Sequence, residues 1–337
     1  MRTTTMTFLI RTFWLLLLSL LLGAVVHASI TDIRNEFPTQ ERVLELAYLS
    51  RHVYSINSTE TVPVPGDNIT LNETNYTVIS WIDRDSTEVL MTSTTSNNDV
   101  IVTFRGTEEI TDWVVNLQFN QVPLFPNAAN LSTNLYHMLL PPTGDNDNVV
   151  PIQAHQGFHQ VYALYQDILK LIRPHVKGRR VYVTGHSLGG ANAHLFSTLL
   201  ALSQPGTTEV QCITYGQPRV GNLGMKMLVE QIYNLNMWRL VNQDDVVPRI
   251  PLPSQGFIHA GHYYYRNSPQ NNNRTGAYYR QIGDATQNYE GIPDLTYAQL
   301  GNSDPNNFVR DHSMELYIDW ISTTTLPQQF SQTNGSS

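Results

Sequence analysis

The spacing of hydrophobic residues divides the chain into an irregular first part and a regular second part. Apolar positions at helical spacing predict a helix over residues 40–55, and the polar stretch 56–75 predicts a loop. Residues 120–153, rich in Pro, Asn and Gly and without periodicity, predict a long insertion. Three short runs of β-branched and aromatic residues predict strands at Thr77–Asp83, Glu88–Thr92 and Val100–Phe104.

From residue 156 onward, helical and strand-like patterns alternate. They predict helices at Phe158–Val176, Leu188–Leu202 and Leu223–Leu235, and strands at Arg180–Thr184, Glu209–Tyr215 and Met237–Asn242. A second polar loop, 266–307, precedes a last helix over roughly Phe308–Ile321. Strands that alternate with helices at this spacing build a parallel sheet with both faces covered. We therefore predict an α/β fold with a central, mostly parallel sheet.

The first 28 residues have the composition of a secretory signal peptide. Arg2 and Arg11 precede the apolar run Trp14–Val26, which is short for a membrane span, and Val26-His27-Ala28 fits a small-x-small cleavage pattern. We predict that residues 1–28 are removed, that 29–337 form a single domain without a transmembrane span, and that the protein is secreted. An uncleaved signal anchor and a lysosome-like destination are the alternatives.

Charge, sequons and the single cysteine narrow the class of protein. The 337-residue chain has a formal charge of −8, and loss of the two N-terminal arginines lowers it to −10, which argues against nucleic acid as a partner. Cys212 lies in an apolar strand, so we predict a packed core thiol and no intramolecular disulfide. Sequons predict N-glycans among Asn57, Asn68, Asn72, Asn75, Asn130, Asn273 and Asn334.

The strongest chemical signal lies in Val181–Gly190. Gly185-His186-Ser187-Leu188-Gly189 matches G-x-S-x-G between an apolar strand and a small-residue helix, which is the context that a nucleophile elbow requires. The glycines permit the tight turn, and the helix N-terminus faces developing negative charge. We predict that Ser187 is a nucleophile; the alternative is an ordinary N-capping serine. His186 is predicted to pack on the other side of the strand end from Ser187.

Four motifs in this order resemble the fungal-type class 3 lipase family. They are Thr103–Thr107, Gly185–Gly190, Tyr215–Asn222 and Asp245–Pro248. The resemblance covers roughly residues 40–325. It implies an α/β-hydrolase fold and serine ester-hydrolase activity, for which neither a metal nor an organic cofactor is needed.

A nucleophilic serine needs a base and a carboxylate that orients the base, in the chain order Ser, acid, His. Asp244 and Asp245 both follow a predicted strand, and the resemblance selects Asp245, directly before Val-Val-Pro. The candidate bases are His259, His262 and His312. The resemblance selects His312, and His262 is the alternative.

The oxyanion hole needs two prearranged donors. The residue after the nucleophile supplies the Leu188 backbone N–H, and the resemblance places the second donor at Thr107. Arg105, in the same segment, is predicted to make a structural ion pair or hydrogen bond.

A short amphipathic helix is predicted after Thr107, because Ile110, Trp113, Val114 and Leu117 recur at i, i+3, i+4 and i+7. The alternative is a purely structural helix whose apolar face packs on the core. By resemblance the segment is a lipase lid that contacts substrate.

The prediction is therefore a secreted serine ester hydrolase that cleaves acylglycerol ester bonds through an acyl-enzyme, on a lipid or ester substrate at a lipid–water interface. A feruloyl esterase or a phospholipase A1 on the same site is the alternative. A non-catalytic lipid-binding protein with the same fold is the remote one. Chain-length and head-group preference, lid movement, oligomeric state, pH optimum and sequon occupancy stay open.

Overall fold

The computed structural model describes residues 33–56, 62–84, 87–110, 120–124, 151–159, 162–176, 178–204, 208–266, 276–278 and 310–328. The predicted signal peptide, residues 111–119 of the candidate lid and most of the two predicted long loops lie outside these ranges. None of the described helices is long and apolar enough to cross a membrane.

Nine strands of the described residues form one sheet, in the order β1-β2-β3-β4-β7-β8-β9-β10-β11. Strands β4, β7, β8, β9 and β10 run parallel, and the strands outside them pair antiparallel. Their bounds are β1 Asn68–Leu71, β2 Thr74–Arg84, β3 Thr87–Thr94, β4 Val100–Phe104, β7 Arg180–His186, β8 Glu209–Tyr215, β9 Leu235–Asn242, β10 His262–Arg266 and β11 Gly276–Tyr278. A separate ribbon joins β5 (Gln121–Pro123) to β6 (Gln153–His155).

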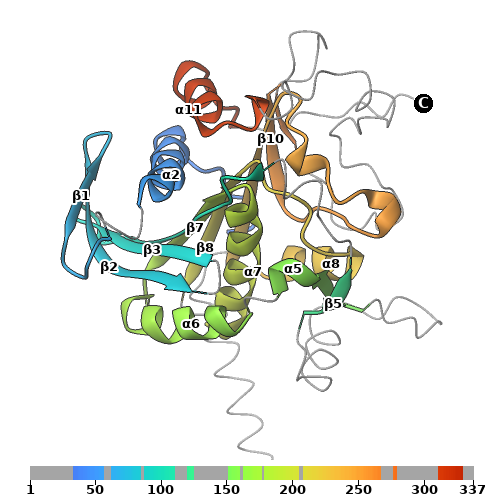
Figure 1. Cartoon of the computed structure of the whole chain (residues 1–337), viewed down its shortest axis with the longest axis horizontal. Coiled ribbons are helices and arrows are strands. Elements are labelled where there is room, and N and C mark those ends of the chain that lie inside the picture. Colours follow the sequence, from blue (N-terminus) through green and yellow to red (C-terminus); the bar gives the residue numbers. More distant parts are fainter. Residues whose placement is uncertain are drawn as a thin grey trace, which may run out of the picture.

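Helices cover both faces of the parallel strands (Figure 1). One face carries α2 (Gln40–His52), the short helix η1 (Val53–Ser55) and α11 (Met314–Thr323). The other carries α5 (Gln156–His159), α6 (Tyr162–Val176), α7 (Leu188–Ser203) and α8 (Leu223–Gln231). The predicted α/β architecture with a central parallel sheet is therefore confirmed.

The two faces have separate hydrophobic cores because side chains alternate along each strand. Val181 and Val183 of β7 pack in the core under α6, α7 and α8, whereas Tyr182 between them packs in the core under α2 and α11. Cys212 is fully buried in the first core, as predicted, and burial raises the pKa of its thiol to about 12.

The structure differs from the sequence prediction mainly at the edges of the sheet. Residues 56–75, predicted as a loop, contain strand β1, which pairs with β2 as a hairpin. The two linking residues, Asn72 and Glu73, have φ of 44° and 67°, which is the backbone of a two-residue type I′ turn. The polar, sequon-rich composition hid this strand because an edge strand buries little. Helix α8 ends at Gln231, and β9 begins at Leu235 rather than Met237.

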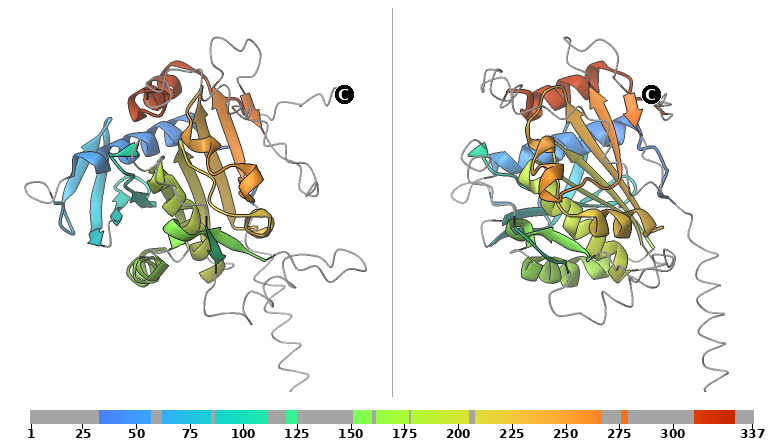
Figure 2. Two further views of the ribbon diagram at one scale, coloured as in Figure 1. Left: turned by 45° about the vertical axis from the view of Figure 1, so that its right-hand side comes forward. Right: turned by 90° about the vertical axis from the view of Figure 1, so that its right-hand side faces the viewer.

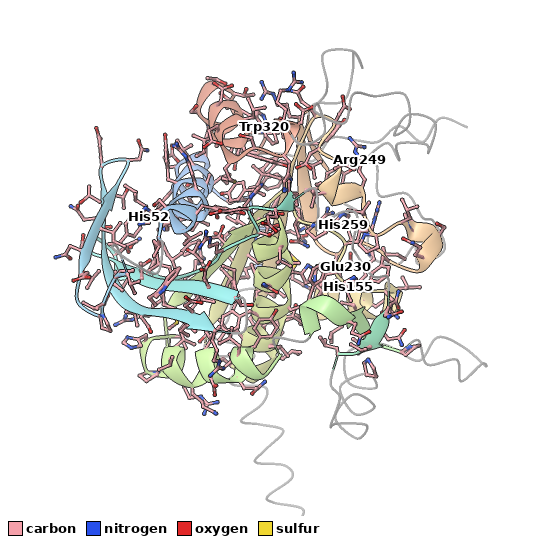
Figure 3. All side chains as sticks on the ribbon, viewed as in Figure 1. His52, His155, Glu230, Arg249, His259 and Trp320 are labelled. Carbon is pink, nitrogen blue, oxygen red and sulfur yellow. The ribbon has the colours of Figure 1, made fainter. Side chains whose placement is uncertain are left out.

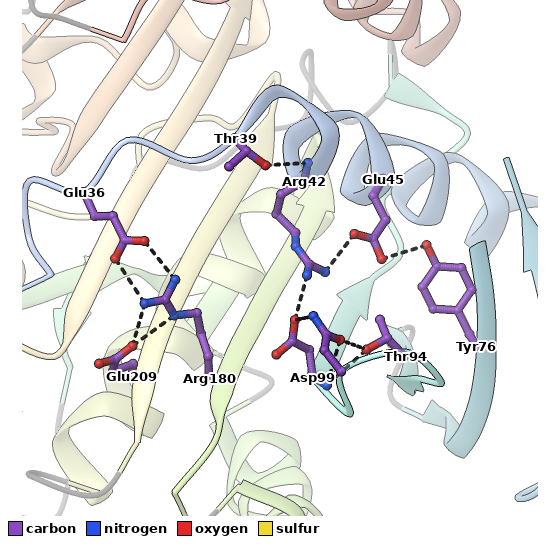
Figure 4. Close-up of polar contacts among 10 residues, drawn as sticks. Glu36, Thr39, Arg42, Glu45, Tyr76, Thr94, Asp99, Arg180 and Glu209 are labelled. Atoms are coloured by element: carbon purple, nitrogen blue, oxygen red, sulfur yellow. Dashed lines mark hydrogen bonds and ion pairs between the residues drawn. The ribbon is translucent and has the colours of Figure 1, made fainter. Parts of the chain in front are cut away.

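A polar network fastens the segment before α2 to the amino ends of the strands (Figure 4). The Arg180 guanidinium, at the start of β7, binds Glu36 and Glu209 at 2.8 Å each. In α2, Arg42 binds Glu45 at 2.7 Å and Asp99 at 2.6 Å. These side chains are partly exposed, so the network fixes geometry more than it adds stability.

Buried histidines give the fold a predictable dependence on pH. His194 of α7 is 2% exposed, and within the described residues its ring makes one hydrogen bond, between Nδ1 and the Gln217 amide nitrogen at 3.0 Å. Burial, reinforced by nearby Arg239, lowers the pKa of His194 to about 3. Burial likewise lowers the pKa of His262 to about 4.

Because the unfolded chain takes up these protons near pH 6.5 and the folded chain does not, stability present at neutral pH is lost as the pH falls below 6.5. Between pH 7 and pH 5, His194 alone is expected to remove about 2 kcal/mol from the free energy of unfolding. Urea unfolding of wild type and His194→Gln across this range measures the effect. The variant should show a flatter slope with pH; a constant offset with an unchanged slope would contradict the expectation.

Candidate active site

Four of the parallel strands end at the same edge of the sheet, and the predicted site residues follow directly after them. The loop with Thr107 follows β4, Ser187 follows β7, Gly216 follows β8 and Asp245 follows β9. Because carboxyl ends of parallel strands share one edge, these segments converge there. His312 reaches the same edge from the turn that precedes α11.

Ser187 occupies a strained turn between β7 and α7. Its φ of 59° and ψ of −129° lie outside the regions that non-glycine residues ordinarily adopt. The Ser187 N–H donates a hydrogen bond to the carbonyl of Tyr215 at 3.0 Å, which anchors the turn to β8. A strained backbone of this kind persists where the surrounding structure holds it, and it marks a functional turn.

Close backbone approaches on both sides of the turn require glycine. A Cβ on Gly185 would lie 2.4 Å from the carbonyl carbon of Gly189, and a Cβ on Gly189 would lie 2.3 Å from the carbonyl oxygen of Phe104. The start of α7 can therefore pack directly against β7 and β4. This is the strand–turn–helix that the G-x-S-x-G pattern predicts.

Asp245 and His312 form a buried pair. The His312 Nδ1 lies 2.9 and 3.0 Å from the two carboxylate oxygens of Asp245, and the residues are 4% and 0% exposed. The Val247 N–H and the Tyr317 hydroxyl also donate to this carboxylate, at 2.9 and 2.7 Å. An acceptor-only carboxylate requires the proton on Nδ1 of His312, which leaves Nε2 as the basic nitrogen in the neutral ring.

The two atoms that would exchange a proton, on Ser187 and His312, have no hydrogen-bond partner among the described residues. These atoms, Ser187 Oγ and His312 Nε2, are both buried. Gly216 packs closely against the Asp245–His312 pair, since a Cβ on it would lie 2.8 Å from the His312 ring and from Asp245 Oδ2. It follows Tyr215, whose carbonyl accepts the Ser187 N–H. Catalytic hydrogen bonds often form only with substrate bound, so two unpaired atoms of this kind are the groups that a serine nucleophile and its base would offer.

The two predicted oxyanion donors flank Ser187. Gly106, next to Thr107, approaches the serine closely, since a Cβ on Gly106 would lie 3.2 Å from Ser187 Cβ. The Thr107 hydroxyl accepts the Glu109 N–H at 3.2 Å and keeps its own proton for donation. Leu188 is the first residue of α7, where backbone N–H groups have no partner within the helix. Of the predicted lid residues, Ile110 is half-buried, and Trp113, Val114 and Leu117 lie outside the described residues.

The structure places the alternative acid and bases elsewhere. The Asp244 side chain is one-third exposed and lies 3.9 Å from Arg249. The His259 Nε2 hydrogen-bonds to the carbonyl of Pro248 at 2.7 Å, and Figure 3 shows its ring beside the loop that carries Arg249. The His262 Nε2 hydrogen-bonds to the carbonyl of Arg34 at the opposite edge of the sheet. Of the three candidate bases, His312 is the one whose hydrogen bond to Asp245 the structure shows.

The structure also shows the surroundings of two neighbouring residues. Arg105 makes the predicted ion pair, at 2.7 Å to Glu88. The His186 ring packs on the side of α11, with its centroid 4.3 Å from that of the His312 ring, and hydrogen-bonds to Tyr54 and to the His312 carbonyl. That its side chain leaves the strand end on the other side from Ser187 stays a prediction.

Sequence reasoning missed Tyr317 and Gly216. Tyr317 has the spacing of a core residue in α11, and its fully buried ring fulfils that role. A helical pattern does not reveal that the Tyr317 hydroxyl hydrogen-bonds to the Asp245 carboxylate. Gly216 has φ of 58° and lies in the Tyr215–Asn222 motif, so a glycine directly after a buried strand was the signal available.

Within the described residues, no group of three or more His, Cys, Asp or Glu side chains is arranged to hold a metal ion. The site offers a serine, an imidazole with an orienting carboxylate, and backbone donors at a helix N-terminus. These groups suit nucleophilic attack by Ser187 on a carbonyl carbon.

Comparisons with known proteins agree with this geometry. The family model "Lipase (class 3)" matches residues 101–255. The chain is 28% identical over 262 residues to a lipase of Rhizomucor miehei, covering 73% of this chain and 65% of the relative. It is 29% identical to a secreted mono- and diacylglycerol lipase of Gibberella zeae, covering 49% of this chain and 43% of the relative. A chloroplastic phospholipase A(1) of Arabidopsis thaliana is also 29% identical, with 51% and 38% covered. The match thus spans less than two thirds of each of these relatives.

Solved structures show the same fold. The native propeptide complex of the Rhizomucor miehei lipase superposes with a TM-score of 0.51 at 25% identity, covering 70% of this chain and 71% of the other. The mono- and diacylglycerol lipase of Aspergillus oryzae superposes with a TM-score of 0.57 at 20% identity, covering 82% and 96%. The motifs, the fold and these relatives together make the chain similar to the fungal-type class 3 lipases and give it the α/β-hydrolase fold.

Proposed function

We propose that the protein is a secreted serine hydrolase that cleaves the carboxylic ester bonds of acylglycerols. The observation that carries this proposal is the buried Asp245–His312 hydrogen bond beside the strained turn at Ser187. The names of the relatives support the substrate class, since they include a lipase and mono- and diacylglycerol lipases.

In the proposed reaction, Ser187 Oγ attacks the ester carbonyl while His312 Nε2 accepts the hydroxyl proton. The Leu188 N–H and Thr107 donate to the oxyanion, whose charge would otherwise make the tetrahedral intermediate inaccessible. His312 then returns the proton to the leaving alcohol, and water hydrolyses the acyl-enzyme in a second cycle. Asp245 holds the imidazole in the reactive tautomer and stabilises its charged form.

Substrate access requires movement of the chain. Ser187 is fully buried, so an ester carbonyl reaches its hydroxyl only after a covering segment is displaced. The amphipathic segment that contains Ile110, Trp113, Val114 and Leu117 is the candidate lid, and its apolar face would contact acyl chains at a lipid surface.

A fluorophosphonate probe tests the nucleophile, and a substrate panel tests the substrate class. We expect the probe to label the purified protein, with peptide mass spectrometry placing the adduct on Ser187. Tributyrin and a diacylglycerol should be hydrolysed faster than phosphatidylcholine or a feruloyl ester, and tributyrin hydrolysis should rise above its solubility limit as droplets form. A protein that takes no label and hydrolyses none of the esters would be the lipid-binding protein instead.

Phospholipase A1 activity is the second candidate, because the Arabidopsis thaliana relative bears that name at an identity similar to that of the lipases. Hydrolysis of phosphatidylcholine at the sn-1 position, faster than that of triacylglycerol, would favour it over the acylglycerol proposal. A feruloyl esterase would instead prefer the aromatic ester.

N-glycosylation of the β1–β2 hairpin is part of the same proposal. Asn68, Asn72 and Asn75 are all exposed there, as glycan attachment requires. Glycans on this free edge of the sheet would also block pairing with another chain. We expect peptide N-glycosidase F to lower the apparent mass of the protein from a eukaryotic host, and an Asn68→Gln, Asn75→Gln variant to run smaller than wild type before treatment. Identical mobility of the two untreated proteins would contradict glycosylation at these positions.

A further inference from the structure

A chain of contacts crosses the site from the loop after β4 to the turn before α11. It begins where Gly106 packs against the hydroxyl of Tyr54. The approach is close, since a Cβ on Gly106 would overlap the Tyr54 hydroxyl. The Tyr54 hydroxyl lies 2.9 Å from Nδ1 of His186, and Nε2 of His186 lies 2.7 Å from the carbonyl oxygen of His312.

The protons in this chain have one consistent assignment. The carbonyl of His312 can only accept, so Nε2 of His186 carries a proton and donates it. In a neutral ring, Nδ1 is then an acceptor, and the Tyr54 hydroxyl donates to it. Burial and the neighbouring His312 lower the pKa of His186, which keeps the ring neutral. Every bond therefore has one donor and one acceptor.

We propose that Tyr54 and His186 form a positioning relay for ester hydrolysis. Their hydrogen bonds join the nucleophile turn to the turn that carries the base, and the packing of Gly106 on Tyr54 adds the loop that carries the oxyanion donor. The relay rests on the proposed function, because it acts by placing the groups of that reaction. Neither residue touches the Asp245 carboxylate or takes part in proton transfer to substrate.

The position of His186 makes this role specific. It precedes Ser187 in the chain, so its ring orientation and the serine turn share one backbone. Its ring also lies against the His312 ring, with centroids 4.3 Å apart at 34°. The bond to the His312 carbonyl therefore fixes the backbone of the base, and ring packing restricts its side chain. A displacement of about 1 Å between reacting groups costs up to 100-fold in rate.

Tyr54 supplies the link to the oxyanion loop from η1, a part of the chain far from the motifs. It is the second residue after α2, and the Arg105 guanidinium packs over its ring, 5.8 Å from the centroid. The same arginine binds Glu88 and the carbonyl of Ile56. The loop after β4 thus packs against Tyr54 at Gly106 and is held by the Arg105 side chain.

Steady-state kinetics of point variants test the relay. Tyr54→Phe keeps the ring and removes the hydroxyl, so we expect kcat on a soluble ester to fall roughly tenfold with KM within twofold. Tyr76→Phe is the matched control, because its buried ring also ends in a hydroxyl that hydrogen-bonds, at 3.0 Å, to Glu45 away from the site. This control should keep the wild-type kcat.

Two variants of His186 separate hydrogen bonding from packing. His186→Phe keeps a ring beside His312 and loses both hydrogen bonds, so kcat should fall at least as far as in Tyr54→Phe. His186→Gln retains an N–H that can reach the His312 carbonyl and should recover most of that loss. Once His186 is phenylalanine, Tyr54→Phe should have little further effect, since the two residues act as one unit.

If the variants fail to fold, a spectroscopic measurement on the wild-type protein still tests the relay. In ¹⁵N-histidine NMR spectra, His186 should be neutral with its proton on Nε2 at pH 6. A proton on Nδ1, or a charged ring at that pH, would overturn the relay.

The outcomes also separate the relay from the function on which it rests. If wild type hydrolyses esters and is labelled at Ser187, but Tyr54→Phe keeps kcat within twofold, the relay alone is wrong. If wild type neither hydrolyses esters nor takes the fluorophosphonate label, the proposed function is wrong and the relay with it.

Discussion

Replacing Ser187 by alanine is expected to lower kcat/KM for ester hydrolysis by at least about 10,000-fold and to leave the fold intact. The hydroxyl is the only nucleophile at the convergence of the strand ends in this mechanism, so no neighbouring group replaces it. Alanine keeps the Cβ and the backbone strain of the turn unchanged. Because Ser187 Oγ makes no hydrogen bond in the described structure, its removal breaks no stabilising contact.

The measurement combines hydrolysis of tributyrin with thermal unfolding. Ser197→Ala is a matched control, because Ser197 is equally buried on the helix that follows Ser187 and its hydroxyl donates to the His194 carbonyl at 2.9 Å. The control should lose some stability and keep its activity, whereas Ser187→Ala should lose activity and keep its melting temperature. Full activity in Ser187→Ala would refute the proposed mechanism.

Replacing Asp245 by asparagine is expected to lower kcat by roughly 1,000- to 10,000-fold. The amide is isosteric with the carboxylate, but it removes the charge that stabilises the imidazolium. It also brings N–H donors into a site where Val247, Tyr317 and His312 all donate. One N–H must then face a donor or force His312 into the other tautomer, in which Nε2 no longer accepts a proton.

The neighbouring Asp244→Asn is the control for this substitution. Its carboxylate is partly exposed and lies 3.9 Å from Arg249, so we expect kcat within about twofold of wild type. The pair therefore distinguishes the two acids that follow β9. A large loss in Asp244→Asn, with little effect in Asp245→Asn, would mean that the acid was assigned to the wrong aspartate.

The parallel centre of the fold could be predicted from the sequence because its strands are buried on both faces. Such strands appear as continuous apolar runs, and β4 and β8 were predicted with the bounds that the structure shows. Edge elements gave weaker signals: β1 is largely exposed, and its sequence, Asn68-Ile-Thr-Leu71, has the polarity of a loop.

The site was predictable as far as its groups lie within motifs. Ser187, Asp245 and His312 came from G-x-S-x-G and from the family resemblance, and the structure brings Asp245 and His312 into contact. Tyr317 and Tyr54 were not predictable, because each lies in a helical segment where its ring looks like core. Their roles depend on where a hydroxyl ends after folding, and pairings over 72 and 132 residues leave no local pattern.

The network around Arg180 has a practical consequence for how the protein is handled. It fixes residues 33–36 at the amino ends of the strands, where Ile33 also hydrogen-bonds to Tyr233. Ser187 lies at the other end of β7, a strand length of about 20 Å away, and the views in Figure 2 show the segment before α2 apart from the carboxyl edge. A surface or resin attached just before Ile33 would hold the protein with the edge that carries Ser187 turned outward, toward oil droplets in a reactor.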